Sequence, residues 1–210
     1  KINNVKVDIT ESVHRIQQKG LEVHAGFIIG FDNDDESIFD RQIEFIRRAR
    51  IPSAMVGTLG VSPGTQLERR LESEGRLLPG LSYHDGDVFN DLLNFRTKVP
   101  VEILMRGWMR VLTTIYDPQE HFDCIFEMTK AIGTIETTRK TELNRESITS
   151  LLQVLYLQCI KSDYRWQYWR LIARVLLECP SKLDTAMYAA ARGHQLIMYT
   201  RELSGKLEEL

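Results

Sequence analysis

The sequence predicts an α/β segment followed by a mostly helical domain. Up to about residue 78, helical periodicity alternates with two short apolar runs, and beyond about residue 100 apolar residues recur at helical spacing. Strands joined by helices pair in parallel, so the first segment is expected to belong to an α/β sheet or barrel. Turn-forming residues are frequent in between, which predicts three regions: 1–78, a hinge over 79–99, and a helical domain over 100–210.

The first predicted element is a short helix over residues 8–20. Asp8 supplies a side chain suited to the N-cap, and Gly20 stands just past the end. Val13, Ile16 and Gln17 share one side of this helix. The helix is expected to lead directly into a strand.

That strand covers residues 20–32, and its two faces differ. One face carries Val23, Ala25, Phe27, Ile29 and Phe31, and the other carries Glu22, His24, Gly26, Ile28 and Gly30. Glycine inside a strand costs stability and permits close approach to the main chain, so a ligand could lie against this face. A bulge or tight packing would explain the glycines equally well. His24 is either a cavity residue that contacts substrate or an interior imidazole with satisfied hydrogen bonds.

A second helix is predicted over residues 34–50, with Phe39, Ile43 and Ile46 on one stripe. The run Asn33–Glu36 before it has the spacing of a capping box. A calcium-binding EF-hand loop is excluded, because Ser37 stands where that loop needs glycine.

A second strand over residues 53–62 and a helix over residues 65–75 complete the α/β segment. Thr65 and Glu68 form a further predicted capping box. Ligands in α/β proteins lie at the carboxyl ends of strands, which places them in loops 31–35 and 61–65. Neither loop has a phosphate-binding glycine motif, so the surface suits an adenine ring or a small organic ligand.

The helical domain is predicted from apolar spacing. Helices are expected from Pro100 to Ile115 and from Pro118 to Lys130, followed by a polar linker over residues 133–145. Three more helices follow, over residues 144–161, 163–178 and 181–207. The aromatic run over residues 164–169 has basic neighbours and is either packed against the bundle, which its spacing favours, or a stacking or membrane-edge surface.

Several of these motifs resemble one enzyme family. The strand from Gly26 to Asp32 with its capped helix, and the later strand that ends in Pro63, Gly64 and Thr65, are similar to the fifth and sixth strand units of radical S-adenosylmethionine (SAM) enzymes. The sequence of residues 8–52 resembles most the cobalamin-binding branch of that family, which includes hopanoid methylases. Residues 94–96 and 115–118 resemble the helical C-terminal domain of unknown function that often follows the barrel there.

The resemblance implies roles for particular residues. The family's Gly-x-Ile-x-Gly strand supports the adenine of SAM, and here it corresponds to Gly26, Ile28 and Gly30. Asn33 stands where the family often has glutamate, and it and His24 are candidates for the substrate cavity. The next strand end would lie near the adenine or the substrate, which implicates Leu59, Val61, Pro63, Gly64 and Thr65.

The motif that holds the cluster is missing from the sequence. Radical SAM chemistry needs a [4Fe-4S] cluster held by three cysteines in a Cys-x-x-x-Cys-x-x-Cys loop, and Cys124, Cys159 and Cys179 are far apart. The cobalamin-binding Asp-x-His-x-x-Gly pattern is also missing. The chain is therefore expected to be the C-terminal fragment of a longer enzyme, with SAM, the cluster and cobalamin bound only by the intact protein. Its partners would be the N-terminal portion of that enzyme and a small-molecule or lipid-like substrate.

Composition and charge limit which ligands and which cellular location to expect. A net charge of −2 gives no reason to expect nucleic acid, and three scattered cysteines favour a reducing, cytoplasmic location over a disulfide framework. No apolar run is long enough to span a membrane, which leaves peripheral membrane contact open. The alternative to an enzyme fragment is a noncatalytic helical module that binds another protein.

Overall fold

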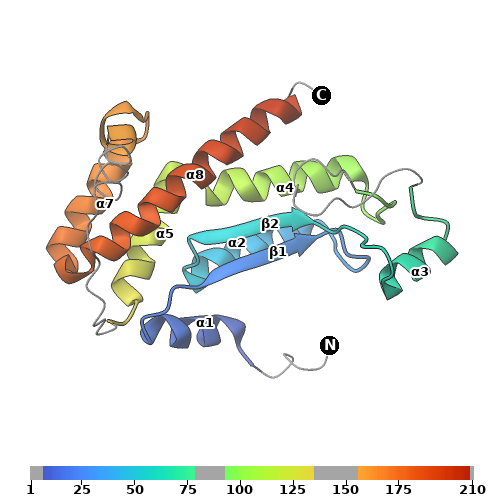
Figure 1. Cartoon of the computed structure of the whole chain (residues 1–210), viewed down its shortest axis with the longest axis horizontal. Helices are drawn as coiled ribbons and strands as arrows, with labels where there is room; N and C mark the ends of the chain where they lie inside the picture. The colour runs from blue at the N-terminus through green and yellow to red at the C-terminus, as the bar shows by residue number, and fades with distance from the viewer. Residues whose placement is uncertain (1–6, 79–92, 135–155, 209–210) are drawn as a thin grey trace. The chain divides into compact units, whose positions relative to one another are not determined.

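The computed structural model describes residues 7–78, 93–134 and 156–208, and Figure 1 traces their order. The first part of the chain contains α1 (Ile9–Gln18), β1 (His24–Ile29), α2 (Ser37–Ala49), β2 (Ser53–Thr58) and α3 (Gln66–Ser73). The remainder contains α4 (Val101–Ile115), α5 (Pro118–Ala131), the π-helix η2 (Leu157–Lys161), α7 (Arg165–Glu178), the short 3₁₀ helix η3 (Pro180–Lys182) and α8 (Leu183–Glu208). These elements follow the predicted order.

The two strands form a two-stranded parallel sheet, as their helical connection requires (Figure 1). The Leu59 N–H donates to the Ile29 carbonyl at 2.8 Å, so pairing continues just beyond both strands. Both strands are shorter than predicted. β1 ends at Ile29 because Gly30 adopts a φ of 100°, which leaves the extended region of backbone conformation.

The chain divides into two compact units. The sheet unit consists of Gly26–Glu44 and Ala54–Leu112, and the helical unit consists of Lys1–Ala25, Phe45–Ser53 and Thr113–Leu210. Each unit gathers segments that are separate in sequence. The predicted division at residues 79–99 stays a prediction, since residues 79–92 lie outside the described ranges.

In the sheet unit, one face of the sheet is buried against helices. Ile29, Ala54 and Val56 are buried on this face, and the Trp108 indole N–H of α4 donates to the Val56 carbonyl at 2.7 Å. Helices α2 and α4 approach closely at Gly107, where a Cβ would lie 2.1 Å from Cζ of Phe39. Only glycine fits there, so this contact fixes how the two helices cover the sheet.

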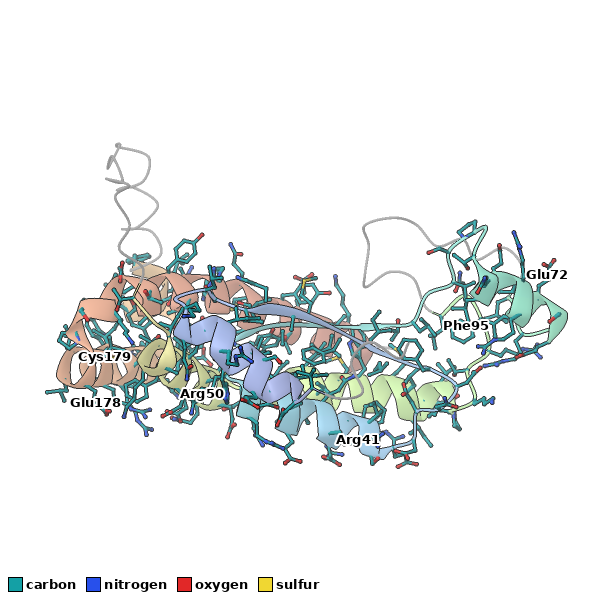
Figure 2. All side chains as sticks on the ribbon, turned by 90° about the horizontal axis from the view of Figure 1, so that it is seen from below. Arg41, Arg50, Glu72, Phe95, Glu178 and Cys179 are labelled. Atoms are coloured by element: carbon teal, nitrogen blue, oxygen red, sulfur yellow. The ribbon has the colours of Figure 1, made fainter. Side chains whose placement is uncertain are left out.

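In the helical unit, the end of α1 is fixed by main-chain contacts. The Gln17 side-chain amide donates to the carbonyls of Ala49 and Arg50 at 3.1 and 2.9 Å, and the Gln17 carbonyl accepts from the Gly133 N–H at 2.8 Å. Arg50, labelled in Figure 2, has a positive φ of 54° where α2 ends. The predicted inward side of α1 is confirmed at Val13 and Gln17, whereas Ile16 is exposed.

Helices α5, α7 and α8 enclose the core of the helical unit. The ring of Phe122 lies 5.8 Å from that of Tyr164 and 6.1 Å from that of Tyr168. The buried residues of α8 include Ala186, Ala189 and Ala190, which are small and permit close packing. Figure 2 shows Glu178 and Cys179 together at the end of α7, where the chain turns toward η3 and α8.

Some sequence expectations need correction. Most of the apolar residues that share one side of α4 by helical spacing are buried, but Val101 is exposed. Phe31 is also exposed, beyond the end of β1. The aromatic run is split, because Tyr164 and Tyr168 pack in the core while Trp166 and Trp169 face outward. Residues 135–145 of the predicted linker and most of the predicted helix over 144–161 lie outside the described ranges. Among the described helices, none combines the length and apolarity needed to cross a bilayer.

Candidate functional site

The second face of the two-stranded sheet is open and apolar. Ile28 of β1 is 50% exposed and Met55 of β2 is 61% exposed, in alternation with the buried residues of the same strands. A Cβ built on Gly26 would meet nothing within 4 Å. The backbone at Gly26 is therefore open to close approach, and tight packing does not explain this glycine.

Gly30 does not extend this open face. It is buried, and a Cβ there would lie 3.4 Å from Cδ2 of Leu104 and 3.7 Å from Cβ of Leu59. Its positive φ also favours glycine. The positive φ of Gly30 and its packing against Leu104 and Leu59 explain why glycine stands there. Among the described residues, no comparable constraint explains Gly26.

The loop after β1 is held by two aspartates. The N–H groups of Gly30 and Phe31 donate to Asp34 Oδ2 at 2.8 and 2.9 Å, and the Ser37 N–H donates to Asp35 Oδ1 at 2.9 Å. The predicted capping box over Asn33–Glu36 is therefore wrong, because Asp34 turns back toward β1 and Asp35 caps α2. Asn33 is exposed at this carboxyl end of β1.

The loop after β2 is held by Asn94, which sequence reasoning noted only as part of a family motif. The Val61 N–H donates to Asn94 Oδ1 at 3.0 Å, and Asn94 Nδ2 donates to the Val61 carbonyl at 2.9 Å. Val61 is buried, so its side chain supports the loop from inside. Leu59 is half-buried beside Gly30.

The predicted cap of α3 is confirmed at Thr65. The Glu68 N–H donates to Thr65 Oγ1 at 3.2 Å, and Glu68 Oε2 accepts from the Gly64 N–H at 2.7 Å. Pro63 and Gly64 are exposed, and a Cβ on Gly64 would meet nothing within 4 Å. The loop at the carboxyl end of β2 thus presents bare backbone next to a firmly capped helix.

A charged cluster that sequence reasoning missed follows β1. Asp32 accepts from Arg70 and from Arg76, each at 2.8 Å, and Arg76 also binds Glu74 at 2.8 Å. The hydrogen bond from Arg76, with both arginine charges, lowers the pKa of Asp32. The charges of the two arginines and the two carboxylates cancel. We therefore interpret the cluster as a structural link between the β1 loop and α3. The sequence indicated this cluster through the acidic Asp32 at the end of the first predicted strand.

His24 lies at the opposite end of β1 from these loops. Its side chain is 56% exposed, and Nε2 lies 4.0 Å from Oε2 of Glu22, which also pairs with Arg192. A ligand at the carboxyl ends of the strands would approach Asn33 and Pro63 before it reached His24.

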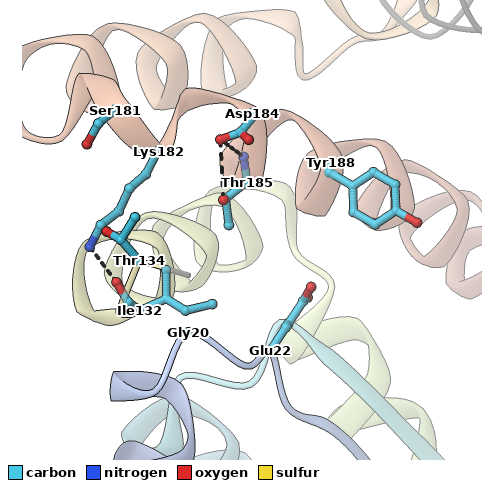
Figure 3. Close-up of a pocket in the computed structure, with 10 residues that line it drawn as sticks. Gly20, Glu22, Ile132, Thr134, Ser181, Lys182, Asp184, Thr185 and Tyr188 are labelled. Atoms are coloured by element: carbon cyan, nitrogen blue, oxygen red, sulfur yellow. Dashed lines mark hydrogen bonds between the residues drawn. The ribbon is translucent and has the colours of Figure 1, made fainter. Parts of the chain in front are cut away.

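The helical unit contains a cavity of about 470 Å³ that sequence reasoning also missed (Figure 3). Its lining comes from the turn after α1, the end of α5 and the start of α8. Lys182 reaches from η3 to donate to the carbonyls of Ile132 and Lys130, and Asp184 accepts from the Thr185 N–H at 2.7 Å. The two charged groups are thus each held by a hydrogen bond, Lys182 to main-chain carbonyls and Asp184 to the main chain of α8.

The cysteines lie in unreactive settings. Burial raises the pKa of the Cys124 thiol to about 12, and burial also raises the pKa of Cys159. Cys124 on α5, Cys159 on η2 and Cys179 between α7 and η3 are all free thiols. The described residues contain no group of three histidine, cysteine or acidic side chains placed to hold a metal ion.

Comparison with known proteins identifies relatives of the chain. Residues 65–209 match a domain of unknown function (DUF4070). The chain is 27% identical over 201 residues to an uncharacterized methyltransferase of Synechocystis sp., covering 95% of the chain and 37% of that protein. It is 27% identical over 213 residues to the hopanoid C-2 methylase of Rhodopseudomonas palustris, covering 97% and 38% respectively. The chain thus spans well under half the length of these relatives, and no solved structure matches it.

Proposed function

The chain belongs to the DUF4070 family, and from that premise we propose that it forms the C-terminal part of a cobalamin-binding radical SAM methylase. The match and the two methyltransferase relatives confirm the resemblance to hopanoid-methylase-like proteins. The finer proposal is that the open sheet face supports the adenine of SAM and forms part of the substrate cavity.

The observation that carries this proposal is the accessible backbone at Gly26. Parallel sheets are normally covered on both faces, yet this face leaves Ile28 and Met55 exposed. A planar ring laid on Gly26 would meet no Cβ, and the two apolar side chains would bound it. A flat aromatic ring on bare backbone has favourable dispersion contacts and displaces water from the apolar side chains beside it. The residues present therefore fit an adenine.

The carboxyl-end loops would complete the site. Asp34 holds the β1 loop and Asn94 holds the β2 loop, so both keep a fixed shape without a ligand. The exposed backbone around Gly64 has open space beside it, so the nucleoside or the substrate could approach it closely. In this proposal the two loops position the ligand and exclude water.

The bound cofactors would supply the chemistry of the intact enzyme. By family resemblance, SAM at a [4Fe-4S] cluster supplies a radical and cobalamin a methyl group for a small-molecule or lipid-like substrate. The described residues have no metal-binding group that fits the cluster, so we assign its ligands to the N-terminal portion of the enzyme. A cytoplasmic location is part of the same proposal.

The Gly26→Val variant tests the adenine role. A valine there would fill the surface on which the ring lies, while strand geometry tolerates it and no neighbour stands within 4 Å. In the enzyme that contains this chain, we expect SAM to bind about tenfold more weakly by calorimetry, equivalent to about 1.4 kcal/mol. The melting temperature should change little.

The matched control is Gly205→Ala on α8, where a Cβ also meets nothing within 4 Å. Its SAM affinity should equal that of the wild type. Gly30→Val is unsuitable, because its positive φ and the contact with Leu104 would destabilise the fold. Unchanged SAM affinity in a folded Gly26→Val enzyme would refute the adenine role. A gene with no Cys-x-x-x-Cys-x-x-Cys motif upstream would instead favour the noncatalytic helical module.

A further inference from the structure

The outward face of α7 is apolar, unlike that of an ordinary surface helix. The inward face is buried through Tyr168, Leu171 and Val175. The opposite face of such a helix is normally polar. Here Trp166 is 71% exposed and Leu177 is 85% exposed, and Trp169 and Leu176 are about half exposed. A helix that is apolar on both faces is expected to have a second apolar neighbour.

The exposed residues form one continuous stripe. At 3.6 residues per turn they fall within an arc of roughly 100°. We call this the α7 stripe, which consists of Trp166, Trp169, Ala173, Leu176 and Leu177. On the same helical projection, Arg165 lies at one border of the arc and Arg170 lies at the other.

Helix η2 adds apolar surface at the N-terminal end of the α7 stripe. The Trp169 indole N–H donates to the Cys159 carbonyl at 3.2 Å, which places η2 beside the first turns of α7. The next residue, Ile160, is exposed, and Lys161 follows it. The sequence alone favoured inward packing of Trp169, and the structure shows it half exposed with its polar atom satisfied.

The unpaired charges that border the stripe are positive, and the nearby carboxylate of Asp163 is bound by both guanidinium nitrogens of Arg201 at 2.9 Å. Among the described residues, Lys161, Arg165 and Arg170 make no ion pair. By contrast, Arg174 of the same helix pairs with Asp123 and Glu127 and lies 3.7 Å from the Phe126 ring centroid. The only acidic residue of α7 is Glu178, which binds Lys130 at 2.7 Å. An anionic surface is therefore complementary to this face.

We propose that the α7 stripe docks on the surface of an anionic lipid membrane. A helix lying in the interface buries tryptophan and leucine at the boundary of headgroups and acyl chains. Arginines at both borders of the stripe can reach lipid phosphates while their stems stay on apolar surface. Exposed indoles suit this boundary, where one part of the ring is apolar and the N–H faces polar groups. The proposal goes beyond the proposed function and does not depend on SAM binding.

Sedimentation with lipid vesicles tests the proposal on the whole protein. We expect binding to vesicles of phosphatidylcholine mixed with phosphatidylglycerol, much weaker binding to phosphatidylcholine alone, and weakening by salt. The double variant Trp166→Ala, Trp169→Ala should lower the partition coefficient by about tenfold or more. Replacing Arg165 and Arg170 by glutamine should lower it by about fivefold per charge. Leu21→Ala, which removes another exposed apolar side chain of the helical unit, should have no effect.

Tryptophan fluorescence supplies a test that does not need a truncated side chain. Lipids with brominated acyl chains should quench the wild-type protein through Trp166 and Trp169. In the 210-residue chain, replacing both by phenylalanine leaves buried Trp108 as the last indole, and its emission should not be quenched. Absence of wild-type quenching, or undiminished vesicle binding by the folded double alanine variant, would overturn the proposal. It would also be overturned by a dimer that the double alanine variant converts to monomer, since a second copy would then cover the stripe.

Discussion

At the scale of single residues, His121 is an imidazole enclosed in the core of the helical unit. It is 1% exposed, and its ring centroid lies 5.3 Å from that of Tyr116 and 6.1 Å from that of Phe122. Its Nε2 atom is buried without a hydrogen-bond partner. Burial lowers the pKa of His121 to about 4, against a smaller opposing effect of a backbone hydrogen bond with Ile115.

This pKa predicts a loss of stability in mild acid. The unfolded chain takes up a proton near pH 6.5 and the folded chain only near pH 4, so the unfolded state binds more protons between these values. Stability should therefore fall as the pH drops from about 6.5 to about 4, by roughly 2–4 kcal/mol in total. Urea denaturation at a series of pH values measures this slope.

The control for this slope is His121→Leu, which removes the titrating group and keeps an apolar side chain. The variant should show a flatter dependence on pH between 4 and 6.5. Asp32 and Asp163 have lowered pKa values, so their contributions are lost at still lower pH and do not confuse the comparison. A wild-type protein equally stable at pH 4.5 and pH 7 would contradict the assignment.

What the sequence could predict about single residues depends on how local their contacts are. The Thr65 cap could be predicted, because a cap is a pattern within a few residues, and strand alternation likewise placed Gly26 and Ile28 on one face. Asn94 and His121 could not be assigned roles, because each meets residues that are distant in sequence or hidden by burial. Asn94 bonds Val61, 33 residues away, and His121 packs against Gly193.

At the scale of elements, α8 offers a matched pair of glycines. A Cβ on Gly193 would lie 2.2 Å from Nε2 of His121, whereas a Cβ on Gly205 would meet nothing within 4 Å. Gly193→Ala should therefore destabilise the protein by about 1–3 kcal/mol, because the buried imidazole is wedged between aromatic rings and cannot move cheaply. Gly205→Ala should stabilise by roughly 0.5–1 kcal/mol, since alanine is the better helix former. Thermal unfolding of both variants measures the difference.

The reverse order of stability in these two variants would mean that α8 does not pack on His121 as described. Combining Gly193→Ala with His121→Ala should recover part of the loss, because the clash disappears with the ring. This recovery separates a local clash from a general loss of helix packing.

The elements themselves were largely predictable, and their ends were less so. Helical spacing located α2, α4 and α5, and their bounds lie within three residues of the predicted ones. β1 was predicted too long because an apolar run continues to Phe31, whereas the backbone turns at Gly30. The Asn33–Glu36 cap was wrong because Asp34 has two competing partners in space, the N–H groups of Gly30 and Phe31.

At the scale of the whole molecule, the two compact units do not correspond to two consecutive stretches of the sequence. The sheet unit and the helical unit each combine separate segments, and helices α2 and α4 contribute to both. Sequence composition reveals turn-rich regions, but it does not reveal which distant segments pack together. The predicted barrel likewise stays a proposal, since the described strands number two.

The whole chain also predicts how it responds to iron and sulfide. A [4Fe-4S] cluster needs closely spaced thiolates, and the three cysteines lie on α5, on η2 and after α7. Cys124 stays protonated at neutral pH because burial raises its pKa to about 12. Anaerobic reconstitution of the 210-residue chain should therefore leave less than stoichiometric iron after desalting, while the same treatment of the longer enzyme proposed above should yield a brown protein. A stoichiometric cluster on the chain alone would show that its cysteines converge, and would contradict both their separate positions in the fold and the proposed assignment of cluster ligands to the N-terminal portion.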